Sequence, residues 1–308
     1  MNPMAPFDWL SDLTPLFSAQ ECWFDGTYQQ HVTGSFMTLS STPYSISCGG
    51  GLLAEHIGRF RFTPSIIQQL GQVTDPLGRC LFHESFLNHL QRLRLRIHVQ
   101  AAPEGTLLFA DEPLLLIQGP KIQALLLDSA FRLLIWESTF WATVSATNSE
   151  KKIPEATGYN SEIPPWAFNE AGWKKRAEYI GGGVISEDTK LDLWPGISFT
   201  KDDKQPLVKQ IRRLFVGDTP VGDVWLSALD EKKASLSKTD ISFQDSINNR
   251  PKEVVMSRFQ NIYQPLLLKG HPILGTNRLD YLHQRTVKQF EIFGRTNPME
   301  YPRGWFLG

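Results

Sequence analysis

Apolar residues in the first ninety positions recur at helical spacing. Asp12 stands where a helix cap belongs, the apolar pattern continues to Trp23, and Asp25-Gly26 is a common stop signal. These positions predict a first helix that ends at Trp23. Further helices are expected over residues 52–60, 64–70 and 82–90, with short strand-like pieces among them.

The period of the apolar positions changes to two after Leu93. Apolar residues then alternate with polar ones as far as Gln100, which is the pattern of a half-buried strand. More strands are expected over residues 107–109 and 113–118. Gly119-Pro120 ends the last of them and starts a helix over residues 121–136, which is apolar nearly all round and is therefore predicted to be buried.

The second half of the chain is less regular. A polar, proline-containing stretch predicts a loop between two helical segments, and two strands precede a polar and exposed stretch. A clear helical pattern returns only near the end. The expected elements are a loop over 147–172, a helix over 173–179, strands over 207–215 and 221–229, an exposed stretch over 230–250 and a helix over 279–293.

Composition places the chain among globular proteins of one or two domains. It has 308 residues, of which 41% are hydrophobic, 11% aromatic and 20% charged, and its net charge is −1. Such a balance gives no long-range attraction to nucleic acid or to a membrane surface, so neither partner is expected. The start has no signal-peptide pattern and residues 124–136 are too short to span a bilayer, so a cytoplasmic location is expected.

Metal and disulfide chemistry find little support in the sequence. The three cysteines are widely spaced and form no Cys-x-x-Cys pair. His83 and His89 are six residues apart, which turns their imidazoles about 240° from each other on a helix. No metal site is therefore expected.

Two other patterns allow an anion-binding interpretation. Arg94, Arg96 and their neighbours Arg92 and His98 form a basic alternation that suits a phosphate or nucleic acid, but a solvated strand face is the favoured interpretation. Gly49-Gly50-Gly51 before a helix suits a phosphate. It lacks the Lys-Ser/Thr of a P-loop and the dinucleotide GxGxxG, so a flexible turn is favoured, and residues 181–183 have the same ambiguity.

Several segments, read in order, match one known family. The most specific runs Ala-Pro-Glu-Gly-Thr-Leu-Leu-Phe-Ala-Asp-Glu-Pro-Leu over residues 102–114, and Thr139 and Thr143 follow in a Thr-x-x-Ala-Thr motif. In these segments the chain resembles the nicotinate phosphoribosyltransferases, which make nicotinate mononucleotide for NAD salvage. Other matching segments are residues 11–26, 60–63, 177–182, 209–231 and 297–302.

The resemblance implies an α/β fold in three parts. A mixed α+β lobe would be formed by an N-terminal segment, residues 1–130, together with a returning C-terminal segment, residues 199–308. Residues 131–198 would form a truncated (β/α) barrel remnant between them. A complete barrel of this kind needs roughly 200–250 residues, so the barrel cannot be whole.

The resemblance also implies which polar positions face substrate or phosphate. They are Asp12, Thr139, Thr143, Gly181 and Gly182. Each has a structural alternative: Asp12 is a natural helix cap, the two threonines stand one turn apart on a segment expected to be buried, and the glycines suit a turn.

The family's catalytic positions are largely replaced. Thr14 stands where the family has a nicotinate-stacking tyrosine, and Ile-Pro-Pro-Trp at 163–166 stands where it has a phosphate-binding arginine pair. Val184 replaces an aspartate. The family's reactive histidine has no counterpart, because no histidine lies between His98 and His271. No catalytic residue is therefore assigned.

These departures predict a protein that is inactive alone and acts as a partner or regulatory subunit. It would form a homo-oligomer, or a hetero-oligomer with a full-length family enzyme, through exposed tryptophans at 141, 166, 173 and 194. The alternative is an active enzyme with an atypical or composite site, which would use phosphoribosyl pyrophosphate, ATP and Mg²⁺. A small-molecule sensor is a third interpretation.

Overall fold

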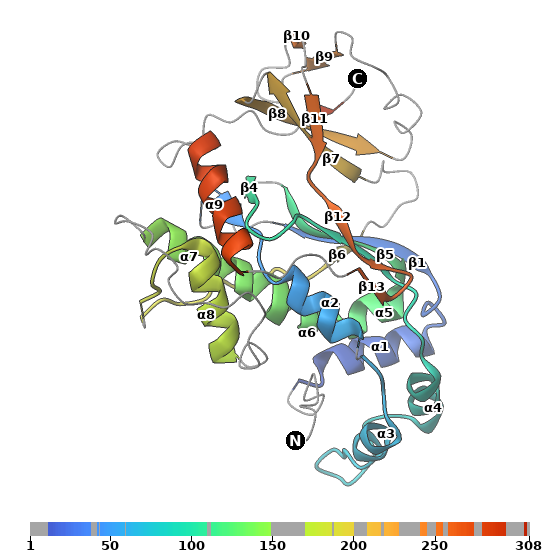
Figure 1. The fold of residues 1–308 in the computed structure, drawn as a ribbon. Coiled ribbons are helices and arrows are strands. Elements are labelled where there is room, and N and C mark those ends of the chain that lie inside the picture. The colour runs from blue at the N-terminus through green and yellow to red at the C-terminus, as the bar shows by residue number, and fades with distance from the viewer. Residues whose placement is uncertain are drawn as a thin grey trace.

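The computed structural model of the chain has helices and strands in both halves of the sequence (Figure 1). No helix among the described residues is long and apolar enough to cross a membrane. The structure describes residues 12–37, 42, 44–58, 60–109, 112–148, 170–186, 188–199, 208–216, 219–227, 241–244, 251–254, 258–273, 279–293 and 305–306.

An open six-stranded sheet forms the centre of the molecule. Its strands come from both halves of the chain, and every neighbouring pair is antiparallel. The late strand β12 pairs with β3, so the C-terminal half returns to the sheet that the N-terminal half starts. In sheet order the strands are β13 (His271–Pro272), β12 (Gln264–Leu268), β3 (His98–Ala101), β5 (Pro113–Pro120), β1 (His31–Met37) and β6 (Ser198–Phe199).

The N-terminal helices follow the sequence prediction closely. Thr63 caps α3 by accepting a hydrogen bond from the backbone N–H of Ile66 at 3.3 Å, and a proline follows it at the first helical position. The helices are α1 (Thr14–Phe24), α2 (Gly50–Gly58), α3 (Pro64–Gly71) and α4 (Glu84–Arg92). Apolar side chains of α1, α3 and α4 share one core with the following helix α5 (Lys121–Leu126).

The strand predicted from Leu93 begins later than expected. Residues 93–97 keep the alternation of exposed arginines with more buried apolar residues, but β3 starts only at His98. Instead of a neighbouring strand, the side-chain amide of Gln123 binds the backbone at Arg94 and Arg96. The burial pattern of residues 93–97 was therefore predicted correctly. Their backbone binds the side chain of Gln123, however, and the regular strand begins only at His98.

The helix predicted over residues 121–136 is confirmed as buried but is not one regular helix. It consists of α5, α6 (Asp128–Phe131) and a π-helical turn (Arg132–Glu137), and α7 (Ser138–Asn148) continues it. The π-helical turn brings the carbonyl of Leu134 against Gly49, where an added Cβ would lie 1.5 Å from that oxygen. Gly49 also has a φ of +92°, so glycine is required there for two reasons.

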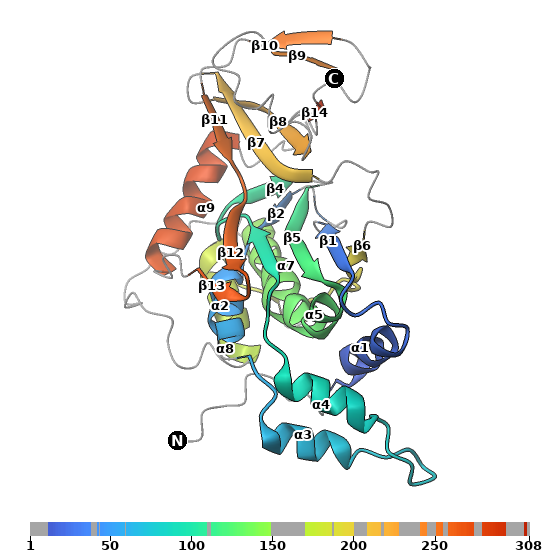
Figure 2. The same ribbon diagram turned by 90° about the vertical axis from the view of Figure 1, so that its right-hand side faces the viewer.

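The C-terminal region adds a second, four-stranded sheet, which lies at the end of the molecule away from α3 (Figure 2). Helix α9 has the predicted bounds, and two predicted strands are found within two residues of their expected ends. The structure does not describe the side chains of residues 230–250, so their expected exposure stays a prediction. The strand β9 lies within this range. These elements are β7 (Val208–Val216), β8 (Thr219–Ser227), β9 (Ile241–Gln244), β10 (Pro251–Val254), β11 (Arg258–Asn261), α9 (Leu279–Phe293) and β14 (Trp305–Phe306).

Arg213 of β7 joins the second sheet to the rest of the molecule. It is only 4% exposed, and its guanidinium donates a hydrogen bond to the carbonyl of Leu107 at 3.2 Å. The same group lies 5.4 Å from the ring centre of Phe109 and 4.8 Å from that of Phe293. Both rings therefore contribute cation–π attraction to this contact.

The fold is mixed α/β, as predicted, and the described residues contain no closed barrel. A two-stranded pair, β2 (Tyr44–Ile46) with β4 (Leu107–Phe109), packs in one apolar cluster with α7, α9 and α8 (Glu170–Gly181). The loop expected over residues 147–172 lies mostly outside the described residues. This cluster forms one wall of the site described next.

Candidate functional site

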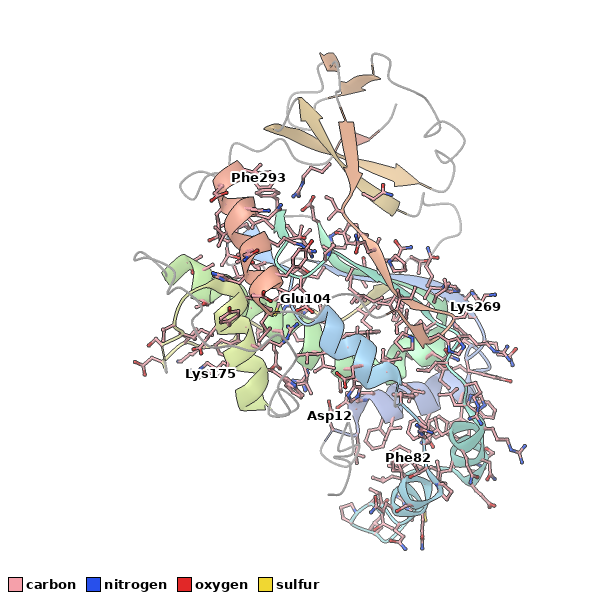
Figure 3. All side chains as sticks on the ribbon, in the orientation of Figure 1. Asp12, Phe82, Glu104, Lys175, Lys269 and Phe293 are labelled. Carbon is pink, nitrogen blue, oxygen red and sulfur yellow. The ribbon has the colours of Figure 1, made fainter. Side chains whose placement is uncertain are left out.

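Two of the polar residues that the sequence singled out, Thr139 and Thr143, lie in one buried region together with the Gly49–Gly51 run. We call it the polar seam: the turn from Ile46 to Gly51, Glu104, Thr139 and Thr143 of α7, and Arg176 of α8. Four segments that are distant in sequence meet there, and Glu104 lies beside the first turn of α2 (Figure 3).

The carboxylate of Glu104 occupies the N-terminus of α2. It accepts hydrogen bonds from the backbone N–H groups of Gly49 and Gly51, each at 2.8 Å. These donors and the positive end of the helix dipole make the place suited to an anion. The phosphate that the glycine run suggested is therefore replaced by an internal carboxylate.

Arg176 completes the environment of Glu104. Its Nη1 and Nη2 atoms donate to the two carboxylate oxygens at 2.5 and 2.9 Å, which is a bidentate pair. Arg176 is fully buried and Glu104 is 6% exposed, so the pair has almost no contact with solvent. The Nε atom of Arg176 is buried and has no hydrogen-bond partner among the residues that the structure describes.

Both members of the pair are charged in the folded protein. Burial raises the pKa of Glu104, but the charge of Arg176 and the hydrogen bonds from Arg176, Gly51 and Gly49 outweigh it and hold the pKa below its ordinary value. Burial lowers the pKa of Arg176, and the neighbouring Glu104 raises it further than burial lowers it. The ion pair is thus stable at neutral pH.

Cys48 is the one thiol in the polar seam, and it is not activated. It is 1% exposed, and its Sγ atom accepts a contact from Arg176 Nη1 at 3.6 Å. Burial, followed by the charge of Glu104, raises its pKa well above the ordinary range. A nucleophilic cysteine requires the opposite shift, so the thiol is neutral and unreactive.

The hydroxyl groups of Thr139 and Thr143 bind the protein's own backbone. Thr143 Oγ1 accepts from the N–H of Ile46 at 2.9 Å, and Thr139 Oγ1 accepts from the N–H of Cys48 at 3.2 Å. Both side chains are fully buried. They hold the turn after β2 against α7, which agrees with the structural alternative that the sequence left open.

Gly181 and Gly182 lie at the contact between α7 and α8. An added Cβ on Gly181 would lie 2.2 Å from the carbonyl oxygen of Ala142, and Gly182 has a φ of +84°. The Gly182 N–H donates to the carbonyl of Glu178 at 2.8 Å. Helix packing and a helix end therefore account for both glycines.

Asp12 belongs to a different, partly exposed cluster. Its Oδ1 atom accepts from the N–H of Thr14 at 3.1 Å and its Oδ2 atom from the hydroxyl of Ser129 at 2.6 Å. Arg132 lies 3.7 Å from the same carboxylate. Burial raises the pKa of Asp12, but the hydrogen bonds from Ser129 and Thr14 and the charge of Arg132 lower it below its ordinary value.

The other positions named from the sequence do not extend the polar seam. Thr14 is the first residue of α1, and Val184 is 75% exposed. The segments 163–166 and 297–302 lie outside the described residues. His83 binds Ser85 at the start of α4 while His89 stacks on Trp23 at 4.3 Å, so the two imidazoles face different surroundings as their spacing predicts.

The predicted surface of exposed tryptophans is wrong for the three that are described. Trp141 is half-buried against Phe140 and Lys174, and Trp173 is also half-buried. The indole of Trp194 packs on Trp136, with ring centres 5.9 Å apart. Trp166 lies outside the described residues. Tryptophans in the shortened region of the chain were expected to stay exposed, but the three that are described pack against the main hydrophobic core.

Sequence reasoning missed the central pair. In the sequence, Glu104 stands out only as part of the family motif, and Arg176 follows Lys174 and Lys175 in what reads as a solvated basic run. The sequence did contain one signal, the helical spacing. Arg176 lies four residues before the apolar Ile180 and therefore on the same face of the helix. In the structure both residues are fully buried.

Comparison with known proteins identifies the family resemblance. No protein-family model matches the chain. Nicotinate phosphoribosyltransferase of Bacillus subtilis (strain 168) is 27% identical over 180 residues, which cover 56% of this chain and 34% of that enzyme. The chain resembles the nicotinate phosphoribosyltransferases, as the sequence motifs predicted. It spans about a third of the length of this curated relative.

One solved structure shows a similar fold. The crystal structure of human nicotinic acid phosphoribosyltransferase aligns with a TM-score of 0.66 and 13% identity, and the alignment covers 97% of both chains. Nicotinate-nucleotide pyrophosphorylase from Pyrococcus furiosus aligns with a TM-score of 0.44 and 10% identity. The human structure therefore shows that this nicotinate phosphoribosyltransferase-like chain has a similar fold.

Proposed function

We propose that this nicotinate phosphoribosyltransferase-like protein serves NAD salvage without catalysing the family reaction alone, and that it acts as a partner or regulatory subunit. Residues 131–198 would be the remnant of a truncated barrel between the lobe segments 1–130 and 199–308. The protein would be located in the cytoplasm.

One observation carries the proposal of inactivity: the anion position at the start of α2 is filled by Glu104. The N–H groups of Gly49 and Gly51 and the fork of Arg176 are all used by that carboxylate. A phosphate could enter only by displacing a buried, bidentate ion pair, which leaves an uncompensated charge. The site is therefore built for internal stability.

The chemistry of the surrounding side chains supports the same proposal. The hydroxyls of Thr139 and Thr143 are engaged by backbone groups, and the thiol of Cys48 is neutral. No histidine lies between His98 and His271 to act as a phosphate acceptor or a base. Transfer of a phosphoribosyl group needs donors aimed at the pyrophosphate, and in the polar seam the N–H groups of Gly49 and Gly51 and both Nη atoms of Arg176 already bind Glu104.

The partner role rests on exposed apolar residues in the segment that follows α8. Val184 is 75% exposed and Leu193 is 94% exposed, with Leu191 at 38% between them in sequence. Apolar side chains exposed in one short segment favour contact with another protein. The partner would be a second copy of the chain or a full-length family enzyme.

A product assay tests the proposal of inactivity directly. The purified chain is incubated with nicotinate, phosphoribosyl pyrophosphate and ATP–Mg²⁺, and nicotinate mononucleotide is followed by mass spectrometry. We expect no product above a heat-killed control and no rise in melting temperature with saturating ligands. Product formation would instead establish the composite-site enzyme and would mean that Glu104 is displaced in the active state.

The partner role has a separate test. Light scattering on the chain alone and mixed with a full-length family enzyme is expected to show a mass above that of one 35.0 kDa chain. Leu193→Asp should reduce the assembled fraction, whereas Lys190→Asp, an exposed position in the same segment, should not. A monomer that joins neither itself nor the enzyme would contradict the proposal.

A further inference from the structure

Three chain segments meet at the outer edge of the six-stranded sheet, away from the polar seam. The turn of the β12–β13 hairpin lies on the extended segment before β3: Gly270 N–H donates to the carbonyl of Ile97 at 2.8 Å. An added Cβ on Gly270 would lie 2.3 Å from the carbonyl of Leu95. The end of α2 touches the same hairpin, since a Cβ on Gly58 would lie 3.2 Å from Pro272.

This junction gathers positive charge from two distant parts of the sequence. We call the exposed side chains of Arg94, Arg96, Lys269 and His271 the cationic face; Figure 3 labels Lys269, far from Glu104. The four residues come together because the hairpin turn packs on residues 95–97. In the part of the chain that the structure describes, none of the four forms an ion pair.

The two arginines of the cationic face are held in a fixed extended conformation. Gln123 is 4% exposed; its Oε1 atom accepts from the N–H of Arg96 at 2.7 Å, and its Nε2 atom donates to the carbonyl of Arg94 at 3.0 Å. The buried side-chain amide of Gln123 thus forms the backbone hydrogen bonds that a neighbouring strand would otherwise form. Residues two apart on an extended chain point to the same side about 6.6–6.8 Å apart, so the guanidinium stems of Arg94 and Arg96 leave the backbone in parallel.

Exposed apolar side chains adjoin the cations. Leu268 is 51% exposed and Ile273 is 39% exposed, and they flank the turn that holds Lys269 and His271. The segments 92–98 and 268–273 contain no Phe, Tyr or Trp on which a nucleic-acid base would stack. The surface therefore combines unpaired cations with aliphatic groups.

We propose that the cationic face binds an extended acidic segment of another protein, with carboxylates on alternate residues. Carboxylates two residues apart on an extended partner match the spacing of Arg94 and Arg96, and each guanidinium binds a carboxylate with a two-pronged geometry. The inference holds whether or not the chain is catalytically active.

The chemistry of the cationic face favours a protein over a nucleic acid as its partner. Single-stranded nucleic acids gain affinity from base stacking on large aromatic side chains as well as from phosphate contacts, and the two segments of the cationic face contain no Phe, Tyr or Trp for such stacking. The net charge of the whole chain is −1, so it provides no general attraction to polyanions. Fixing Arg94 and Arg96 before binding lowers the ordering cost for one specific partner.

Fluorescence anisotropy with the full chain tests the inference. The probe is a labelled twelve-residue peptide of three Glu-Leu-Glu-Thr repeats, and the comparison probes are its Gln-for-Glu counterpart and a twelve-nucleotide single-stranded RNA. We expect only the acidic peptide to bind, with an affinity that falls as salt rises. Equal binding of the Gln peptide, tighter binding of the RNA, or no binding of the acidic peptide would overturn the proposal.

Variants separate the cationic face from general charge. Arg94→Glu with Arg96→Glu should weaken peptide binding by about tenfold or more, because both attractive contacts become repulsive. Lys190→Glu, at an exposed position on another segment, should leave it unchanged. Gln123→Leu keeps Arg94, Arg96, Lys269 and His271 and should weaken binding severalfold by freeing the arginine backbone. Unchanged binding would show that the hydrogen bonds of Gln123 have no part in recognition. Circular dichroism confirms that each variant is folded.

Discussion

Charged side chains are buried and paired in the polar seam, whereas on the cationic face they are exposed and form no ion pair among the described residues. In the seam, Glu104 and Arg176 are buried and each satisfies the other, with two further N–H donors on the carboxylate. On the cationic face, Arg94 and Arg96 are exposed and their guanidinium groups have no acidic partner among the described residues. A buried charge must be paired to be tolerated, whereas an exposed one is tolerated by water and remains available for binding.

The largest expected effect follows from breaking the buried pair. Arg176→Met leaves the Glu104 carboxylate buried without its counter-charge, which should lower the free energy of unfolding by about 3–5 kcal/mol. Lys175→Met is the matched control on the same helix; its ion pair with Glu178 is 3.0 Å long but the lysine is 66% exposed, so a loss of about 0–1 kcal/mol is expected. Urea denaturation followed by circular dichroism measures both.

A double variant shows whether the pair itself is needed. Glu104→Gln together with Arg176→Met removes both charges and should recover part of the stability lost in the single variant. A double variant that is less stable than the single one would mean that the carboxylate is held mainly by Gly49 and Gly51 and not by Arg176.

The pH dependence of stability should report on Glu104. Its pKa in the folded protein lies below the ordinary 4.5, so the unfolded chain takes up the proton first as pH falls. The stabilisation is complete above pH 4.5 and decreases as pH falls below it towards the folded pKa. Unfolding free energies measured from pH 7 down through 4.5 should fall more steeply for the natural chain than for the double variant. Parallel curves would contradict this assignment.

A smaller effect is expected from the threonines of the seam. Thr143→Val keeps the shape but leaves the buried N–H of Ile46 without its acceptor, which should lower the free energy of unfolding by about 1–3 kcal/mol. Thr147→Val, exposed on the same helix, should change it by less than about 0.5 kcal/mol. If Thr143→Val is as stable as the control, the hydroxyl is free for a ligand, and the seam is less closed than its hydrogen bonds indicate.

The sequence was most informative where local signals decide the structure. Thr63-Pro64 starts α3 and the apolar spacing of residues 279–293 defines α9, and both were predicted because capping and periodicity act within a few residues. The family resemblance added the α/β fold. The resemblance also pointed to the motif that contains Glu104, but it did not indicate which groups Glu104 binds.

Long-range contacts account for what the sequence did not predict. Arg176 and Glu104 are 72 positions apart, and Gln123 is 27 positions from Arg96, so neither partner can be inferred from local pattern. The same reason explains why Thr139 and Thr143 were candidates for substrate binding. Their partners at Cys48 and Ile46 lie more than ninety positions away.

The smallest effect on stability is expected on the cationic face. Arg94→Ser with Arg96→Ser should change the free energy of unfolding by less than about 0.5 kcal/mol, because the backbone bonds to Gln123 remain, neither guanidinium forms an ion pair among the described residues, and the bond from Arg94 Nη1 to the carbonyl of Leu93 at 3.1 Å is exposed. At low salt the variant should be slightly more stable, since removing two neighbouring cations relieves repulsion that salt otherwise screens. Thermal melts at low and high salt measure both. A clear loss of stability at either salt concentration would show that the arginines support the fold as Arg176 does, and the contrast between a structural and an available charge would fail.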